Sequence, residues 1–365
     1  MGMGFTSLAP VLPLDILRMI FEQAARDDKR TALTLAVVSR LVQYWTEIIL
    51  YSTVNLHRET TCRAFLRTIE TSRTKPRAFF AQRVKSLCIA YDIYNDRTVR
   101  IVSACRGVTS LTFWVVPTTW ATSSAHAHTH GHTHEAITAA LDPLRPKKLS
   151  ILLHGHGHGH GHGHGGVGAN PRFHLSFFQR TTHLAVINRW EDWTAWGGLE
   201  LLPCLTHLSF DVRVGARTGA GAGGVGVQGV GTQGAVAVAR ALDRVLARCT
   251  GLRVCVVLLI FDPDPGVTAA GIVRALVECG RQQRQARVGV PGAEVEGQGE
   301  GRAEGSVDPR LVFMRDPEPF LDREAHSVRE ARVWEIAEET AAAQAQAQAA
   351  GASTGVGAGP RVREI

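Results

Sequence analysis

The hydrophobic positions of residues 11–56 follow a helical period in three successive segments and then alternate. In the first segment, apolar side chains recur at spacings of three and four, which places them on one face of a helix. Thr31 and Ser39 can cap the second and third helices, because their hydroxyl oxygens can accept from free backbone N–H groups. Residues 53–56 alternate and are rich in β-formers, so they predict a short strand.

This three-helix segment carries more apolar residues than three short helices can bury among themselves. A segment this small cannot support its own core. It must therefore pack against the rest of the chain, against a partner, or against both. An ordinary helical hairpin at the start of a globular domain is the other interpretation of the same pattern.

Beyond the first segment, a short pattern with a leucine followed two residues later by another apolar residue recurs along the chain. Each copy alternates and suits a strand with one buried face. Leu87 and Leu111 lie 24 residues apart, as do Leu184 and Leu208, and this period is within the range of leucine-rich repeats. The copies span residues 84–89, 108–113, 146–151, 181–186, 205–210 and 249–254, with a looser copy at 311–313.

Candidate helices lie between these strands, at residues 96–105, 135–141, 235–249 and 268–279, and a further helix at 61–69 precedes them. Strands that alternate with helices at this period predict parallel strands stacked in a curved solenoid. A general α/β domain is the alternative, because buried strands resemble one another in sequence.

Composition and charge remove several classes of partner. The net charge is +7, but the basic residues are scattered, so nucleic-acid binding is not predicted. No stretch approaches the ~20 apolar residues of a membrane span, and we expect no membrane association. The seven cysteines form no C-x-x-C pair, which predicts a reduced protein of the cytoplasm or nucleus.

Two histidine-rich tracts are the candidates for metal chemistry, because neutral imidazole is the commonest metal ligand in proteins. A structural zinc site needs four fixed ligands, whereas alternating Gly-His offers many equivalent choices on a flexible chain. We therefore expect no metal or other cofactor. The candidate ligands, should a metal bind, are His154, His156, His158, His160, His162 and His164.

No motif predicts an enzyme. The glycines of residues 219–234 are spread too widely for a dinucleotide-binding turn, and the chain has no G-x-S-x-G, H-E-x-x-H or kinase motif. One cluster of tryptophans with two acidic residues could anchor a loop or bind a substrate protein. Its candidates are Trp190, Trp193 and Trp196.

The three-helix segment also contains a series of motifs. These are L-P-x-x-I-L-x-x-I-F beginning at Leu12, V-S-R beginning at Val38, Trp45, and I-L-Y-x-x-V-x-L beginning at Ile49. They resemble the F-box family, specifically the F-box-like proteins abundant in mushroom-forming (basidiomycete) fungi. Leu41-Val42 stands where many F-boxes place a Trp. The C-terminal portions of that family look like degenerate leucine-rich repeats.

The resemblance implies a substrate-receptor subunit of a cullin-RING (SCF-type) ubiquitin ligase. The F-box would bind the Skp-family adaptor, and the cullin through it, while the repeats would bind an unknown substrate protein. The alternatives are a repeat-type interaction scaffold without a ligase role and a His-rich metal-binding protein. The residues that the resemblance assigns to the adaptor are Leu12, Pro13, Ile16, Leu17, Ile20, Val38 and Trp45.

The expected fold class is α+β, with an N-terminal three-helix F-box followed by an irregular leucine-rich-repeat-like α/β solenoid that carries low-complexity loop insertions. The expected domains are an F-box-like domain at 8–56, a linking helix at 57–79, a repeat-like domain at 80–339 and a low-complexity tail at 340–365. Disordered insertions are expected at about 121–134, 154–170, 215–234 and 281–308.

Overall fold

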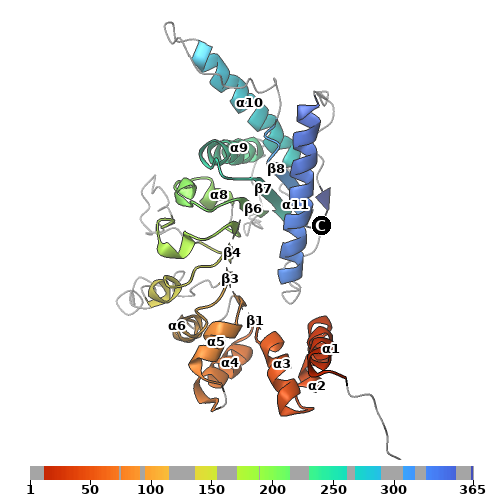
Figure 1. Ribbon diagram of the computed structural model, residues 1–365. Helices are drawn as coiled ribbons and strands as arrows, with labels where there is room; N and C mark the ends of the chain where they lie inside the picture. The colour runs from red at the N-terminus through yellow and green to blue at the C-terminus, as the bar shows by residue number, and fades with distance from the viewer. Residues whose placement is uncertain are drawn as a thin grey trace, which may run out of the picture. The chain divides into compact units, whose positions relative to one another are not determined.

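A computed structural model gives the fold as a mixture of helices and parallel strands (Figure 1), which confirms the mixed helix-and-strand class. The chain divides into two compact units, Met1–Ser110 with Ser124–Leu144, and Leu111–Ser123 with Arg145–Ile365. The structure describes residues 12–73, 75–90, 95–114, 136–153, 171–188, 190–213, 230–260, 268–288, 307–316, 326–350 and 363–364.

The first unit begins with the three expected helices, α1 (Leu14–Asp27), α2 (Lys29–Leu35) and α3 (Arg40–Leu50). Ser39 caps α3 as predicted, because its hydroxyl accepts from the backbone N–H of Val42. The cap of α2 is Asp28 and not Thr31. Only Asp28 separates α1 from α2, so Thr31 already lies inside the helix, where its hydroxyl donates to the Asp28 carboxylate at 2.7 Å.

The rest of the first unit places helices around two parallel strands. β1 (Thr53–Leu56) pairs with β2 (Ser86–Ala90), which confirms both predicted strands. The predicted helix at 61–69 is part of α4 (Glu59–Thr71) and buries one face, as its apolar spacing requires. The remaining helices are α5 (Arg77–Arg83), α6 (Asn95–Ala104) and residues 136–141.

The second unit is built on parallel strands that pair in chain order. The recurring leucine occupies the same place in successive strands, because Leu149, Leu184 and Leu208 lie opposite one another. The carbonyl of Phe113 in β3 (Ser110–Trp114) accepts from Leu152 N at 3.2 Å. The later strands are β4 (Lys148–Ile151), β5 (His183–Val186), β6 (His207–Arg213), β7 (Val254–Ile260), β8 (Leu311–Asp316) and β9 (Arg363–Glu364).

One predicted copy of the repeat was wrong by three residues. The pattern at 249–254 predicted Leu252 as the buried leucine of a strand, but β7 begins at Val254. Cys255 lies opposite Leu208 and takes the place of the repeated leucine. A buried free cysteine behaves as a small hydrophobe, so this copy carries no leucine at the position by which the others are recognised.

Helices cover the two faces of these strands unequally. α8 (Trp190–Trp193), α9 (Val230–Arg248) and α10 (Ala269–Val288) lie on one side, whereas α11 (His326–Ala349) lies on the other (Figure 1). Short 3-10 turns at Ser176–Phe178 and Leu199–Leu201 complete the described elements. No helix in the described part of the chain is long and apolar enough to cross a membrane.

Several elements extend into segments where sequence predicted insertions or a tail. The first turn of α9 and residues 281–288 of α10 are helical, and α11 continues to Ala349 inside the expected tail. The expected insertions at 121–134 and 154–170 lie outside the described residues, as do residues 215–229 and 289–306.

Candidate protein-interaction surface

Large apolar side chains are exposed on the N-terminal helices of the first unit. Among the described residues, eleven large hydrophobic side chains are exposed, and every one except Leu201 lies between Leu12 and Tyr44. Val37 is 83% exposed. We call the ten residues of this segment the exposed apolar set: Leu12, Leu14, Ile16, Met19, Ile20, Leu33, Val37, Val38, Leu41 and Tyr44. Monomeric proteins rarely leave a large apolar patch in water, and such patches mark interaction sites.

The hydrophobic core of the three helices contains few and mostly small side chains, which explains why so many apolar side chains remain outside it. Ala25 of α1 and Ala32 of α2 are buried small residues, and Val42 of α3 is buried with them. The largest buried side chain is Trp45, whose ring stacks on Phe21 with centroids 6.3 Å apart. Three short helices closed on alanines and one aromatic pair leave no interior room for the remaining leucines, isoleucines and valines.

The residues that sequence assigned to an adaptor separate into two groups. Leu12, Ile16, Ile20 and Val38 belong to the exposed apolar set. Pro13 is also exposed, and Leu17 is partly buried. Trp45 is different, because it is only 6% exposed. It lies on the buried face of α3 and therefore belongs to the core of the three helices and not to the exposed surface.

Six members of the exposed apolar set were not singled out from the sequence: Leu14, Met19, Leu33, Val37, Leu41 and Tyr44. The available signal was the excess of apolar residues over what the segment can bury. That excess predicts that some side chains remain outside, but not which ones. The choice depends on which stripe of each helix faces the core, and in α1 the apolar residues cover more than one stripe.

Ion pairs within α1 stabilise this helix in the absence of a partner protein. Glu22 accepts from Arg18 at 2.6 Å and pairs with Arg26 at 3.1 Å, each one turn away. The hydrogen bond from Arg18 is the main reason that the pKa of Glu22 lies below its usual value. Pairs at this spacing stabilise a helix by about 0.2–0.5 kcal/mol each. The surface is thus formed on a helix that has its own stabilising contacts.

The end of α3 is fixed inside the first unit by a second set of contacts. The Nζ atom of Lys75 pairs with Glu47 at 2.9 Å and lies 5.6 Å from the centre of the Tyr51 ring. The same ring packs edge to face against Phe79 and Phe80. Because these contacts join α3 to the α5 region, the exposed apolar set is carried on a scaffold with defined packing.

The tryptophans near α8 serve mainly as anchors. Trp193 is 2% exposed, stacks on Phe210 with centroids 4.2 Å apart, and donates from Nε1 to the Asp211 carbonyl at 3.2 Å. Trp196 is buried too and lies edge to face with Phe173, whereas Trp190 is half-buried. Of the two interpretations, the loop anchor accounts for the two buried rings.

The candidate metal ligands His154 to His164 lie outside the described residues. Within the residues that the structure does describe, no group of three or more His, Cys, Asp or Glu side chains could hold a metal ion.

A stacked histidine pair in the second unit, with His207 buried and His183 partly buried, was missed in the sequence. Thr-His-Leu occurs twice, at 182–184 and 206–208, and the parallel register places His183 opposite His207. Both rings pack nearly perpendicular to the ring of Trp334 from α11, and Nε2 of His207 lies 2.7 Å from a carboxylate oxygen of Glu338. The repeated tripeptide at a 24-residue spacing was the signal that could have located this pair.

A comparison of the chain with protein-family models found no match, and a comparison with curated proteins found no similar sequence. The functional argument therefore depends on the surface chemistry of this chain's own residues.

Proposed function

We propose that this protein is a substrate-receptor subunit of a cullin-RING (SCF-type) ubiquitin ligase. The observation that supports the proposal is the exposed apolar set on three helices whose motifs resemble an F-box. In this proposal the Skp-family adaptor covers that set and links the chain to the cullin. The contacts assigned to the adaptor are Leu12, Pro13, Ile16, Leu17, Ile20 and Val38, together with the six exposed residues that sequence did not single out.

The exposed apolar set would supply the apolar part of a protein interface. A typical specific interface buries about 800 Å² on each partner, from about 20–30 residues a side. Burying one large apolar side chain contributes about 1.5–3 kcal/mol relative to leaving it exposed. The exposed apolar set contains ten such residues, each already partly buried, so covering them would contribute favourable free energy against the entropic cost of association.

The second half of the proposal concerns the repeats. Parallel strands that pair in chain order, with leucine or cysteine in one repeated place, support an irregular leucine-rich-repeat-like solenoid in the second unit. In a receptor, this unit would bind the substrate protein. The chain would make and break no bonds itself. It would raise the effective concentration of the substrate's lysines near a charged ubiquitin-conjugating enzyme, and it would need no cofactor.

The test is co-expression with a fungal Skp-family adaptor, followed by gel filtration. The unchanged chain is expected to elute with the adaptor in a stoichiometric complex. Ile20→Asp and Val38→Asp are expected to lose the complex, because each places a charge in the covered surface. Both side chains are exposed, so the free chain should still fold. Leu201→Asp is the matched control, since Leu201 is an exposed large apolar residue outside the exposed apolar set.

The outcomes separate the proposal from its main alternative. An adaptor complex that is lost with Ile20→Asp and Val38→Asp but kept with Leu201→Asp supports the receptor function. A soluble chain that elutes without the adaptor contradicts it and favours an interaction scaffold without a ligase role. A complex that survives both charged substitutions would mean that the adaptor binds elsewhere.

A further inference from the structure

We propose that the sheet face formed by β7 and β8 is a docking surface for a helix of a partner protein, and that α11 is its internal occupant. On this proposal a partner helix binds by displacing α11 and taking over its contacts. The proposal deepens the receptor function, because it names the surface and the kind of substrate segment that would bind. Its test does not involve the adaptor, so the two proposals can fail separately.

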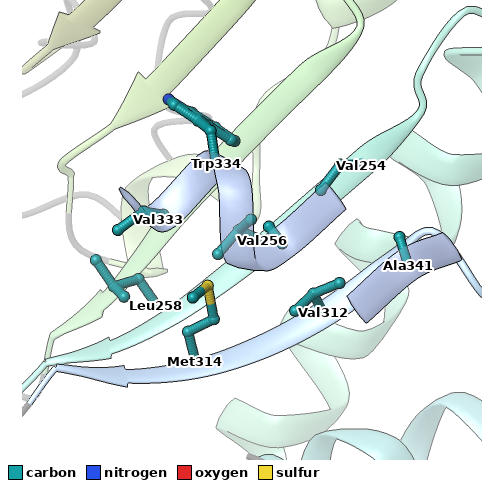
Figure 2. Packing of buried hydrophobic residues seen from close by; sticks show 9 residues of the cluster. Val254, Val256, Leu258, Val312, Met314, Val333, Trp334 and Ala341 are labelled. Carbon is teal, nitrogen blue, oxygen red and sulfur yellow. The ribbon is translucent and has the colours of Figure 1, made fainter. Parts of the chain in front are cut away.

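The contact between α11 and the strands is a narrow apolar strip (Figure 2). Val333 and Trp334 of α11 lie at one end of the strip, and Ala337 and Ala341 continue it along the helix. They pack on alternate residues of the two strands, which point to the same face. These strand residues are Val254, Val256 and Leu258 of β7, and Val312 and Met314 of β8.

The two faces of the strands are covered to very different degrees. Helices α8, α9 and α10 lie on one side, whereas α11 is the only described helix that covers the strands on the other side (Figure 1). Between residues 330 and 350, α11 buries only Val333, Trp334, Ala337 and Ala341. Trp334 is the one large side chain among them. A helix that buries so little apolar area is held weakly, and such elements open before the rest of a fold does.

The strand side of this strip is more apolar than the helix that covers it. Removing α11 would expose a row of valine, leucine and methionine side chains on rigid strands, flanked by the polar His207 of β6. An apolar surface of this kind can receive a helix through residues spaced three and four apart. Among the α11 residues in contact, Trp334, Ala337 and Ala341 have this spacing, and Val333 and Ile336 also pack against the cluster.

Polar contacts define which helix would fit. Glu338 reaches Nε2 of His207 at 2.7 Å, and Gln348 donates to the Val307 carbonyl at 2.9 Å. The carboxylate follows Trp334 by four residues, so both face the same side of the helix. The expected ligand is therefore an amphipathic helix with an aromatic residue, a small residue three positions later and a carboxylate four positions later.

The experiment uses the full chain and a fluorescein-labelled peptide of residues 326–350. Ala337→Lys in the full chain places a charge in the buried contact and should displace the chain's own helix. Ala342→Lys is the matched control, because Ala342 is exposed on the same helix. The peptide is expected to bind the Ala337→Lys chain at least about tenfold more tightly than it binds the unchanged chain or the control, because an occupied site lowers apparent affinity.

A second peptide that itself carries Ala337→Lys shows whether binding uses the same strip, and it is expected not to bind. Failure of the native peptide to bind a folded Ala337→Lys chain would overturn the proposal. Should that variant not fold, hydrogen exchange on the unchanged chain decides. Amides of α11 are expected to exchange faster than those of β7, in a separate opening. Exchange of α11 and β7 together in one opening would make α11 a permanent part of the core.

Discussion

The imidazole rings of His183 and His207 lie face to face, with their centroids 4.1 Å apart and an angle of 2° between their planes. Both rings make the same contact at Nδ1. The Thr182 hydroxyl lies 2.9 Å from Nδ1 of His183, and the Thr206 hydroxyl lies 2.8 Å from Nδ1 of His207. Nε2 of His207 also faces the Glu338 carboxylate, which accepts, so in that ring Nε2 carries a proton. Neither ring can gain a further proton without placing a charge beside its neighbour.

Stability is therefore expected to fall with acidification. Burial, and then the neighbouring His207, lowers the pKa of His183 to about 4 from an ordinary value of 6.5. Burial also lowers the pKa of His207, although the hydrogen bond with Glu338 opposes this shift. The pKa of His183 is about 6.5 in the unfolded chain and about 4 in the folded chain. Between these two values the unfolded chain binds more protons than the folded chain. The free energy of unfolding therefore decreases as the pH falls from about 6.5 to about 4.

The measurement is urea unfolding followed by tryptophan fluorescence at several pH values between 4 and 8. His183→Phe keeps a flat ring against His207 and removes one titrating group. This variant is expected to show a shallower loss of stability below pH 6.5 than the unchanged chain. Equal slopes for both proteins would show that His183 does not control the acid response.

Arg310 joins the end of α9 to the start of β8. Its guanidinium donates to the Leu246 carbonyl at 2.8 Å, to the Leu252 carbonyl at 3.3 Å and to the Asp308 carboxylate at 2.7 Å. The hydrogen bond to Asp308 is the main reason that the pKa of Arg310 is raised. Arg310→Met would leave these acceptors, including the buried Asp308, without that donor. We expect a loss of about 2–3 kcal/mol in the free energy of unfolding.

Arg240→Met is the control for this prediction, because Arg240 is exposed on α9, and it is expected to change stability by less than about 0.5 kcal/mol. Combining Arg310→Met with Asp308→Ala removes the buried carboxylate that has lost the guanidinium and is expected to recover part of the loss. Denaturant unfolding of the three variants gives these free energies. A double variant no more stable than Arg310→Met would mean that the carbonyl contacts carry the effect.

Sequence predicted the strands well because each buried strand has to bring an apolar residue to the same place in the register. That argument located β2 to β6 and failed by three residues at β7, where Cys255 replaces the leucine. The cap of α2 depended on where α1 ends, which sequence does not reveal, so Thr31 was predicted although Asp28 is the cap. The covering of β7 and β8 by α11 was also not predictable, because half of the buried residues that α11 contributes are alanines, which give little periodic signal.

For the candidate surface, the F-box resemblance pointed to the segment that carries the exposed apolar set but named only four of its ten members. Leu12, Ile16, Ile20 and Val38 came from the F-box resemblance and are exposed. Trp45 came from the same motifs but is buried. A motif residue can serve either a core or an interface, and the motif does not distinguish the two. Burial separates these two roles, and burial depends on how the three helices pack.

Trp45 is buried and its neighbour Tyr44 is exposed, so their substitutions should affect stability to very different degrees. Trp45→Ala removes the stacking on Phe21 and empties the thin core of the three helices, at a cost of about 3–5 kcal/mol. Tyr44→Ala removes an exposed side chain and is expected to change stability by less than about 0.5 kcal/mol. Thermal unfolding measures both stability changes, and titration with the proposed Skp-family adaptor measures the effect of Tyr44→Ala on binding. An unchanged adaptor affinity with Tyr44→Ala would exclude that side chain from the interface.

Gly107 tests the packing of the first unit at a place where no side chain fits. A Cβ atom added there would overlap the backbone carbonyl oxygen of Ala81, which cannot move away as a flexible side chain could. Gly107→Ala is therefore expected to destabilise the first unit by about 1–3 kcal/mol, as overpacking does. At Gly251 an added Cβ would meet the Leu205 carbonyl at 3.5 Å, an ordinary contact, so Gly251→Ala is the matched control and should be close to neutral. Denaturant unfolding of both variants compares them directly, and equal midpoints would show that the first unit relaxes around residue 107.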